Sequence, residues 1–282
     1  MTKKRGHILN NILKLVAVLA FAVACVLFPI SIFGVNDYLA LGIVRVLFTG
    51  FGIALMFVFG FKRHLLMRNK DQNNASNFKQ KQPTNILHST LIVIVIFLVS
   101  IFNFPFASFI SEQATLEATA REVFTYLFLN ASVALFEEVF FRGLVLLLLF
   151  ELFQTIKSKK EIDSTTTVRH SLFTVHLPIL IGAVLFSFLH LFSLDLMQLG
   201  YTFLLGLIWG YLVFVTKNIW LAIIAHFIFN LGGTIISMLG SGVFFTTFQI
   251  VITAIVGLIC GVTLVVIESR RIRKLKITTT DT

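Results

Sequence analysis

The chain has 282 residues, of which 57% are hydrophobic and 13% charged, and 32 of them are phenylalanine. This composition excludes an ordinary soluble domain and indicates a polytopic membrane protein whose core is a helix bundle in lipid. The formal net charge of +10 does not indicate a nucleic-acid partner. Nearly all lysines and arginines lie between apolar segments, which is typical of loops held on the cytoplasmic side of a membrane.

Apolar runs long enough to cross a bilayer predict an all-α fold of about eight transmembrane helices. Basic residues precede the first run and follow every second one, so both termini are expected to be cytoplasmic. Two basic side chains inside the runs, Lys14 and Arg45, are expected to extend to the headgroups from near the ends of their helices. The predicted spans lie at roughly 9–34, 38–61, 86–110, 122–155, 177–195, 197–216, 219–239 and 243–267.

A polar stretch rich in Asn, Gln and Lys, residues 62–85, divides the chain. We expect residues 1–85 to form an N-terminal region of two spans followed by this cytoplasmic linker. Residues 86–282 then form a six-span region, in which residues 120–235, approximately, hold the ionisable side chains that lie deep inside a span.

The predicted span 122–155 carries three charged residues: Glu137, Glu138 and Arg142. A charge in hydrocarbon costs about 2.5–3.5 kcal/mol or more unless it is paired or lines a polar cavity. Residues four apart stack on one helix face, so Glu138 and Arg142 are predicted to form an intrahelical ion pair. Glu137 is then left without a local cation, which suits a general base. The alternative is that all three only connect helices by polar contacts.

Two later spans carry the other buried polar residues. His190 follows Phe186 by one helical turn, and His226 and Asn230 share one helix face. Imidazole and carboxamide groups both donate hydrogen bonds, so the second pair suits stabilisation of an oxyanion. With a carboxylate base and a second imidazole, these residues make a set for peptide-bond hydrolysis by an activated water. The alternative for each is helix packing through interhelical hydrogen bonds.

A zinc site is the alternative to a metal-free water mechanism, and its ligands would be Glu137, His190 and His226. The His-Glu-x-x-His signature of helical zinc proteases is absent, so neither a metal nor another cofactor is favoured. Ser187 and Ser193 lie beside His190, but the chain has no Gly-x-Ser-x-Gly motif around them. A serine mechanism is therefore not predicted.

Three motifs occur in a fixed order on separate apolar spans: Glu-Glu-x-x-x-Arg at 137–142, Phe-x-x-x-His at 186–190 and His-x-x-x-Asn at 226–230. In these motifs the chain resembles the CPBP family of intramembrane endopeptidases, the group of CaaX proteases and bacteriocin-processing proteins also called the Abi family. The resemblance covers roughly residues 120–235 and implies a helical membrane bundle in which the motif helices enclose a polar cavity.

The resemblance also implies roles for the motif residues. Glu137 and His190 would activate the attacking water, and His226 and Asn230 would stabilise the oxyanion of the tetrahedral intermediate. The remaining motif residues would support them: Glu138, Arg142 and Phe186.

The predicted function is therefore an intramembrane endopeptidase that acts on a peptide or membrane-protein substrate within or near the lipid bilayer. Compact loops and the strong charge bias favour a multi-pass protein of a bacterial cytoplasmic membrane. One alternative is a non-catalytic membrane scaffold or bacteriocin-immunity protein that acts by binding a membrane-protein partner. Another is a transporter or proton relay, because intramembrane Glu and His residues also serve that role.

Overall fold

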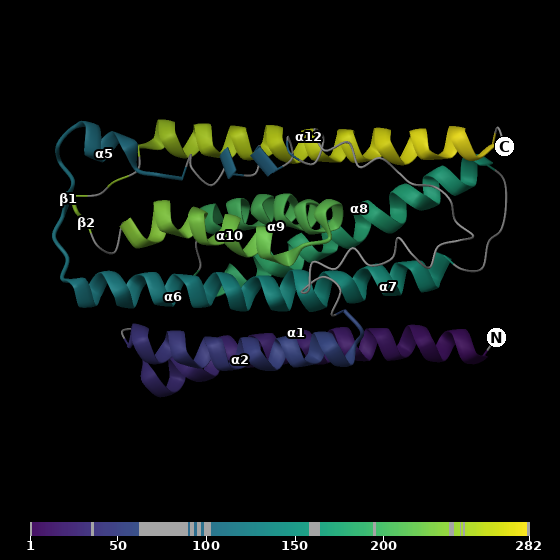
Figure 1. Cartoon of the computed structure of the whole chain (residues 1–282), viewed down its shortest axis with the longest axis horizontal. Coiled ribbons are helices and arrows are strands. Elements are labelled where there is room, and N and C mark those ends of the chain that lie inside the picture. Colours follow the sequence, from purple (N-terminus) through teal and green to yellow (C-terminus); the bar gives the residue numbers. More distant parts are fainter. Residues whose placement is uncertain are drawn as a thin grey trace.

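The computed structural model describes residues 2–34, 37–61, 90, 93–94, 97–98, 103–157, 164–193, 196–236, 240–242, 244 and 246–280. This part of the chain is almost entirely helical, which confirms the predicted all-α class (Figure 1). Two strands of two residues each, β1 (Thr115–Leu116) and β2 (Gly240–Ser241), pair antiparallel at one end of the bundle.

The helical segments include two π-helices and one 3-10 helix, designated η. In chain order they are α1 (Thr2–Phe33), α2 (Tyr38–Val58), α5 (Phe106–Ile110), α6 (Ala120–Glu138), η2 (Val139–Val145), α7 (Leu146–Lys157), α8 (Ser164–Leu189), η3 (His190–Ser193), α9 (Leu196–Thr216), α10 (Ile219–Asn230), η4 (Leu231–Ile235) and α12 (Thr247–Thr280).

Four helices of the described residues are long and apolar enough to cross a membrane, and they match predicted spans one, two, six and eight. They are Arg5–Phe33, Tyr38–Val58, Gln198–Thr216 and Thr247–Ile267. These helices make the chain an integral membrane protein.

The other predicted spans differ in how far the structure describes them. The predicted span 122–155 is the continuous rod formed by α6, η2 and α7, and the fifth and seventh spans contain the shorter apolar helices Phe173–Leu189 and Ile219–Gly233. About half of the predicted span 86–110 and the whole linker 62–85 lie outside the described residues. The count of eight spans and the division into 1–85 and 86–282 therefore stay predictions.

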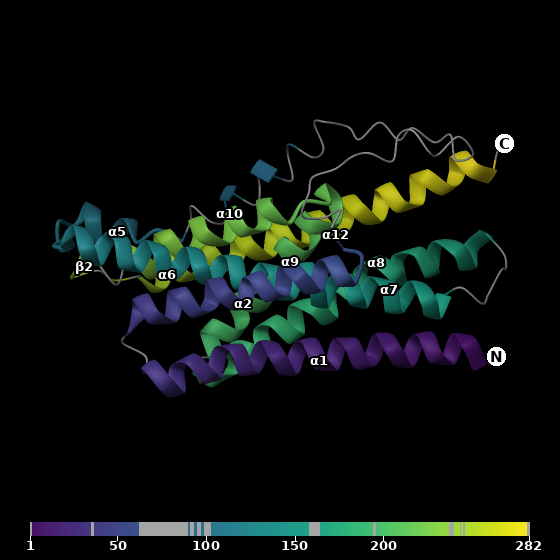
Figure 2. The same ribbon diagram turned by 60° about the horizontal axis from the view of Figure 1, so that its bottom comes forward.

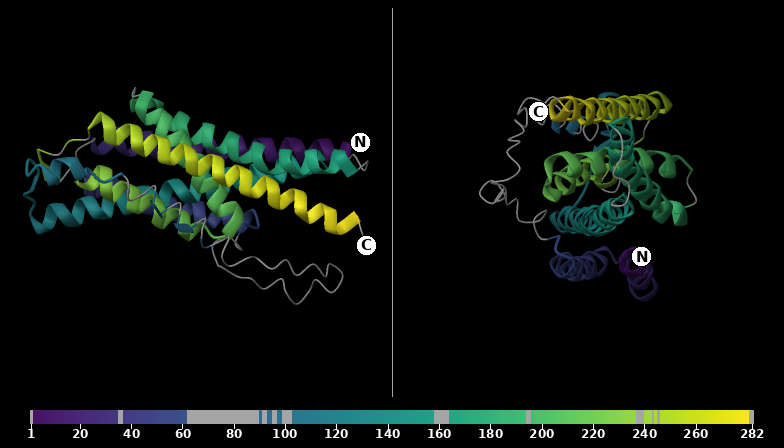
Figure 3. Two further views of the ribbon diagram at one scale, coloured as in Figure 1. Left: turned by 90° about the horizontal axis from the view of Figure 1, so that it is seen from above. Right: turned by 90° about the vertical axis from the view of Figure 1, so that its right-hand side faces the viewer.

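The first residues of α1 and the last residues of α12 lie at the same end of the bundle, whereas α5, β1 and β2 lie at the other end (Figure 1 and Figure 2). A view from the side shows the helices stacked in layers, with α1 and α2 outermost on one side and α12 on the other (Figure 3). A chain that crosses the membrane an even number of times has its two ends on the same side, which is consistent with this arrangement. The side of the membrane on which they lie stays a prediction.

The most buried part of the bundle is η2, whose seven residues are all buried. It packs against α1, α2 and α7, and its phenylalanines Phe140 and Phe141 belong to one continuous apolar core with Trp209 of α9. Gly143 allows α2 to approach closely, because a Cβ at this position would lie 2.6 Å from the sulfur of Met56. The charged motif residues are thus held in the centre of the core.

Helices α8 and α9 meet at another glycine. A Cβ at Gly206 of α9 would lie 2.9 Å from the Cα of Ala183 in α8. That neighbour is backbone and cannot move alone, so an added methyl group has to separate the two helices.

We therefore expect Gly206→Ala to lower the free energy of unfolding by about 1–3 kcal/mol, the usual cost of overpacking. Gly200→Ala on the same helix is the matched control, because a Cβ there meets nothing within 4 Å. It should keep or raise stability, since alanine favours helix over glycine. Thermal unfolding in detergent measures both, and a Gly206→Ala protein as stable as the control would contradict this account of the packing.

Candidate active site

All three sequence motifs lie where a helix departs from α geometry. Glu137 and Glu138 are the last residues of α6 before the π-helix η2, and Asn230 is the last residue of α10 before the π-helix η4. His190 begins the 3-10 helix η3 at the end of α8. Such changes of helix type are frequent at functional sites, because they turn side chains away from the direction that a regular helix would give them.

The predicted ion pair between Glu138 and Arg142 is present. Arg142 Nη1 lies 3.0 Å from Glu138 Oε1, and both side chains are almost completely buried, at 3% and 0% exposure. The guanidinium of Arg142 also lies over the ring of Phe186, 4.2 Å from its centroid. Phe186 therefore covers the ion pair and packs edge-on against His190, with ring centroids 4.9 Å apart.

Glu138 has a second partner that spacing along one helix could not reveal. His226 Nδ1 lies 2.9 Å from Glu138 Oε1, so the carboxylate accepts hydrogen bonds from both Arg142 and His226. The imidazole also stacks on the indole of Trp209, with ring centroids 4.4 Å apart and an interplanar angle of 20°. These two contacts fix both the plane and the rotation of the His226 ring.

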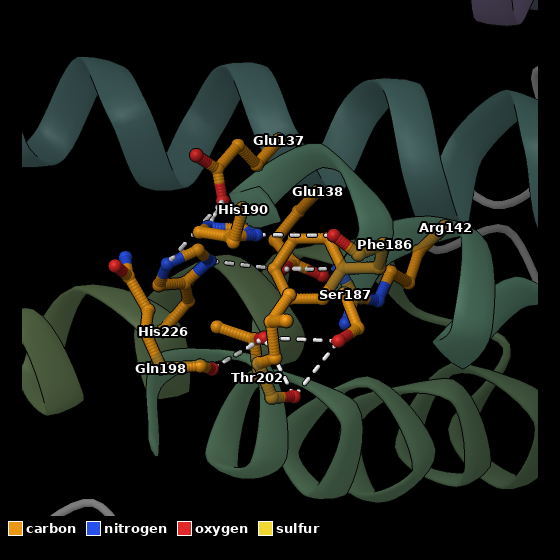
Figure 4. Close-up of polar contacts among 10 residues, drawn as sticks. Glu137, Glu138, Arg142, Phe186, Ser187, His190, Gln198, Thr202 and His226 are labelled. Carbon is orange, nitrogen blue, oxygen red and sulfur yellow. Dashed lines mark hydrogen bonds and ion pairs between the residues drawn. The ribbon is translucent and has the colours of Figure 1, made fainter. Parts of the chain in front are cut away.

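Glu137 faces the two imidazoles rather than the ion pair. Its Oε2 atom lies 3.9 Å from His190 Nε2 and 3.8 Å from His226 Nε2, and its side chain is 18% exposed (Figure 4). His190 Nδ1 lies 3.0 Å from the Phe186 carbonyl, which can only accept, so Nδ1 carries the proton of this bond. The structure thus brings together Glu137, His190 and His226, three of the four predicted catalytic residues.

Asn230, the fourth, lies one turn after His226 and is partly buried at the end of α10. Within the described residues, no hydrogen bond connects its carboxamide with Glu137, His190 or His226. Its place beside the site follows from the helix that it shares with His226.

A second polar network holds the first turn of α9 against α8. Ser187 Oγ donates to the Leu199 carbonyl at 2.8 Å, and Thr202 Oγ1 donates to the Gln198 carbonyl at 2.7 Å. In Figure 4 the carboxamide of Gln198 points from α9 toward the side on which His226 lies. Gln198 could not be singled out from the sequence, because it lies near the start of a predicted span, where a polar residue is ordinary.

Arg45, which the sequence predicts to extend to the headgroups, is partly buried in the bundle. It lies on α2 in the stripe Gly42, Arg45, Thr49 and Gly52, and the two glycines contact α6 and η2. Lys14 lies over the ring of Phe59, 4.9 Å from its centroid. The spacing of small residues three and four apart around Arg45 was the available signal that it faces another helix.

The metal alternative named Glu137, His190 and His226 as ligands. In the part of the chain that the structure describes, no group of three or more His, Cys, Asp or Glu side chains has an arrangement suited to a metal ion. The Nδ1 atoms of both histidines bond to protein acceptors, which leaves their Nε2 atoms directed at Glu137.

Fold and site together define an integral membrane protein with a carboxylate and imidazole centre buried among its helices. Residues 119–232, from the N-cap of α6 to η4, match the family model described as type II CAAX prenyl endopeptidase Rce1-like. The match confirms the predicted resemblance of this part of the chain to the CPBP/CaaX protease family. Comparisons with curated proteins and with solved structures gave no match.

The buried pair yields a stability prediction. Arg142→Met leaves Glu138 buried without its cation, which should cost about 3–5 kcal/mol of the free energy of unfolding. Adding Glu138→Gln removes the unpaired charge but keeps an oxygen that accepts from His226, so the double variant should regain much of the loss. Chemical unfolding in detergent measures the free energy of unfolding of the wild type, of Arg142→Met and of the double variant. Lys14→Met, which removes another basic side chain within a span, is the control; equal stability of Arg142→Met and Lys14→Met would refute the argument.

Proposed function

We propose that the protein is an intramembrane endopeptidase that hydrolyses a peptide bond of a membrane-associated protein or peptide. The observation that carries the proposal is the position of Glu137 Oε2, which lies within 4 Å of the Nε2 atoms of both His190 and His226. Glu138 is already engaged by Arg142, so Glu137 is the carboxylate left for proton transfer.

The protonation pattern favours a water bound between Glu137 and His190. Because His190 Nδ1 donates to the Phe186 carbonyl, Nε2 of the neutral ring is an acceptor, and the Glu137 carboxylate is another. Two acceptors cannot bond to each other, but at 3.9 Å they suit the two O–H groups of one water. A water held in this way keeps a lone pair free to attack a carbonyl carbon.

Side chains of the site can accept and return the proton that hydrolysis moves. As the water attacks, one of its protons passes to Glu137 or His190, and the carbonyl oxygen becomes an oxyanion. When the C–N bond breaks, the same proton passes to the leaving amine. The products are a carboxylic acid and an amine, and both side chains return to their starting forms.

We assign His226 and Asn230 to the oxyanion. The Nδ1–H of His226 is used by Glu138, so Nε2 can donate only when the ring is doubly protonated. In that form the charges of the centre balance, with Arg142 and His226 against two carboxylates. The carboxamide of Asn230 supplies the second donor from the same helix. Preorganised donors of this kind are worth about 10²–10³ in kcat each.

The proposed setting is a bacterial cytoplasmic membrane, and the family name makes prenylated CaaX peptides the first substrates to test. A farnesylated CaaX peptide and an unmodified apolar peptide should be compared in proteoliposomes. The Glu137→Gln, His190→Ala and His226→Ala variants should each lose roughly 100-fold or more of cleavage, because each removes a proton-transfer or charge-stabilising group.

Glu151→Gln on the exposed side of α7 and His176→Ala on α8 are matched controls, and both should cleave at wild-type rates. Cleavage that survives Glu137→Gln would contradict the assigned base. If the wild-type protein cleaves nothing, and a cellular phenotype survives all three site substitutions, the scaffold or immunity role becomes the better description. Transport of an ion or solute that depends on Glu137 would instead favour the transporter or proton-relay alternative.

The mechanism also predicts independence from metals, because side chains supply both water activation and oxyanion stabilisation. Activity should survive prolonged treatment with EDTA and 1,10-phenanthroline, followed by elemental analysis of the protein. Loss of activity that added zinc restores would establish the metal alternative, with Glu137, His190 and His226 as the ligands to test.

A further inference from the structure

The segment 103–116, which we call the cap segment, lies across the end of the bundle where α10 ends and α12 begins (Figure 1). It is tied to those helices at several points. Asn103 Nδ2 donates to the Phe229 carbonyl at 2.9 Å, and Gln249 of α12 donates to the Phe104 carbonyl. Thr115 in β1 pairs with Ser241 in β2. The whole of this segment precedes the residues that match the family model.

Asn103 fits into a slot in the helix that carries His226 and Asn230. Besides its bond to the Phe229 carbonyl, it lies against Gly232 and Gly233. A Cβ at Gly233 would lie 2.4 Å from Asn103 Nδ2, and one at Gly232 would lie 3.0 Å from the Asn103 carbonyl oxygen. Side chains at either glycine would therefore displace Asn103.

These contacts lie on both sides of Asn230. The helix changes from α to π hydrogen bonding directly after this residue, and a π turn alters the direction in which neighbouring side chains point. Asn103 bonds to the residue before Asn230 and packs on the two glycines after it. One side chain from outside the helix thus holds the point at which the helix changes type.

We propose that Asn103 is a positioning residue for Asn230, and that the cap segment is therefore a working part of the active site. The proposal rests on the proposed oxyanion role of Asn230. Asn103 itself does not touch the reacting atoms. It sets the position of the α10 backbone from which the Asn230 carboxamide extends toward the developing charge.

The test uses the full-length protein in proteoliposomes, with a peptide that the wild type cleaves. Asn103→Ala should lower kcat by roughly 10- to 100-fold while KM changes little, because small misplacements of a catalytic group are costly. In an Asn230→Ala background the same substitution should cause no further loss, since the group that it positions is gone. Gly233→Ala, which leaves Asn103 in the chain but fills its slot, should reproduce the loss of kcat.

Asn130→Ala is the matched control. Asn130 is buried, and its Nδ2 also donates to a backbone carbonyl, that of Tyr126 at 3.0 Å, but within its own helix α6. This variant should lose stability without the loss of kcat. Wild-type kcat in both Asn103→Ala and Gly233→Ala, or losses that multiply fully with Asn230→Ala, would overturn the proposal.

Hydrogen exchange separates this inference from the proposed function. Amides of residues 229–236 should exchange faster in Asn103→Ala than in the wild type or in Asn130→Ala, whether or not a substrate is known. If the wild type cleaves no peptide, the proposed function fails, and faster exchange still supports the contact. Unchanged exchange in Asn103→Ala overturns the positioning role in every case.

Discussion

The buried ion pair between Glu138 and Arg142 is the interaction on which the site depends. Five ionisable side chains in the centre of an apolar bundle would be prohibitively costly if each stood charged and alone. Glu138 accepts from Arg142 at 3.0 Å and from His226 at 2.9 Å, and the guanidinium is covered by the ring of Phe186. This arrangement pairs the charge of one carboxylate inside the protein through its Oε1 atom. Glu137, only partly buried, is left facing the two imidazoles, where its charge can serve proton transfer.

The same centre explains why the core around η2 is so tightly packed. Hydrogen bonds and ion pairs strengthen as water is excluded, but an unpaired polar group then becomes more costly. Phenylalanines of η2 and Trp209 exclude water on one side, and Gly143 lets α2 close over the other. Packing and chemistry are therefore coupled. A substitution that loosens the helices admits water to the ion pair and also changes the ring plane of His226, which is stacked on Trp209.

Much of this could be read from the sequence, because hydropathy and residue spacing are local properties. The long apolar helices and the pairing of Glu138 with Arg142 follow directly from them. The contacts that connect different helices could not be predicted in this way. The bond from His226 to Glu138 joins positions 88 residues apart, and the π turns after Glu138 and Asn230 depend on tertiary packing rather than on local propensity.

The segment that matches the family model contains every motif, but it does not contain every group that acts on the site. Gly42 and Gly52 of α2 pack against α6 and η2, and Asn103 bonds to α10 from the cap segment; all three residues precede the match. A helix in lipid gains little from apolar contact with its neighbours, so polar and close-packed contacts such as these carry much of the specificity of assembly. The motif helices supply the proposed reacting groups. Their relative positions depend on α2, the cap segment and α12, which is why the proposed catalytic centre belongs to the whole bundle rather than to residues 119–232 alone.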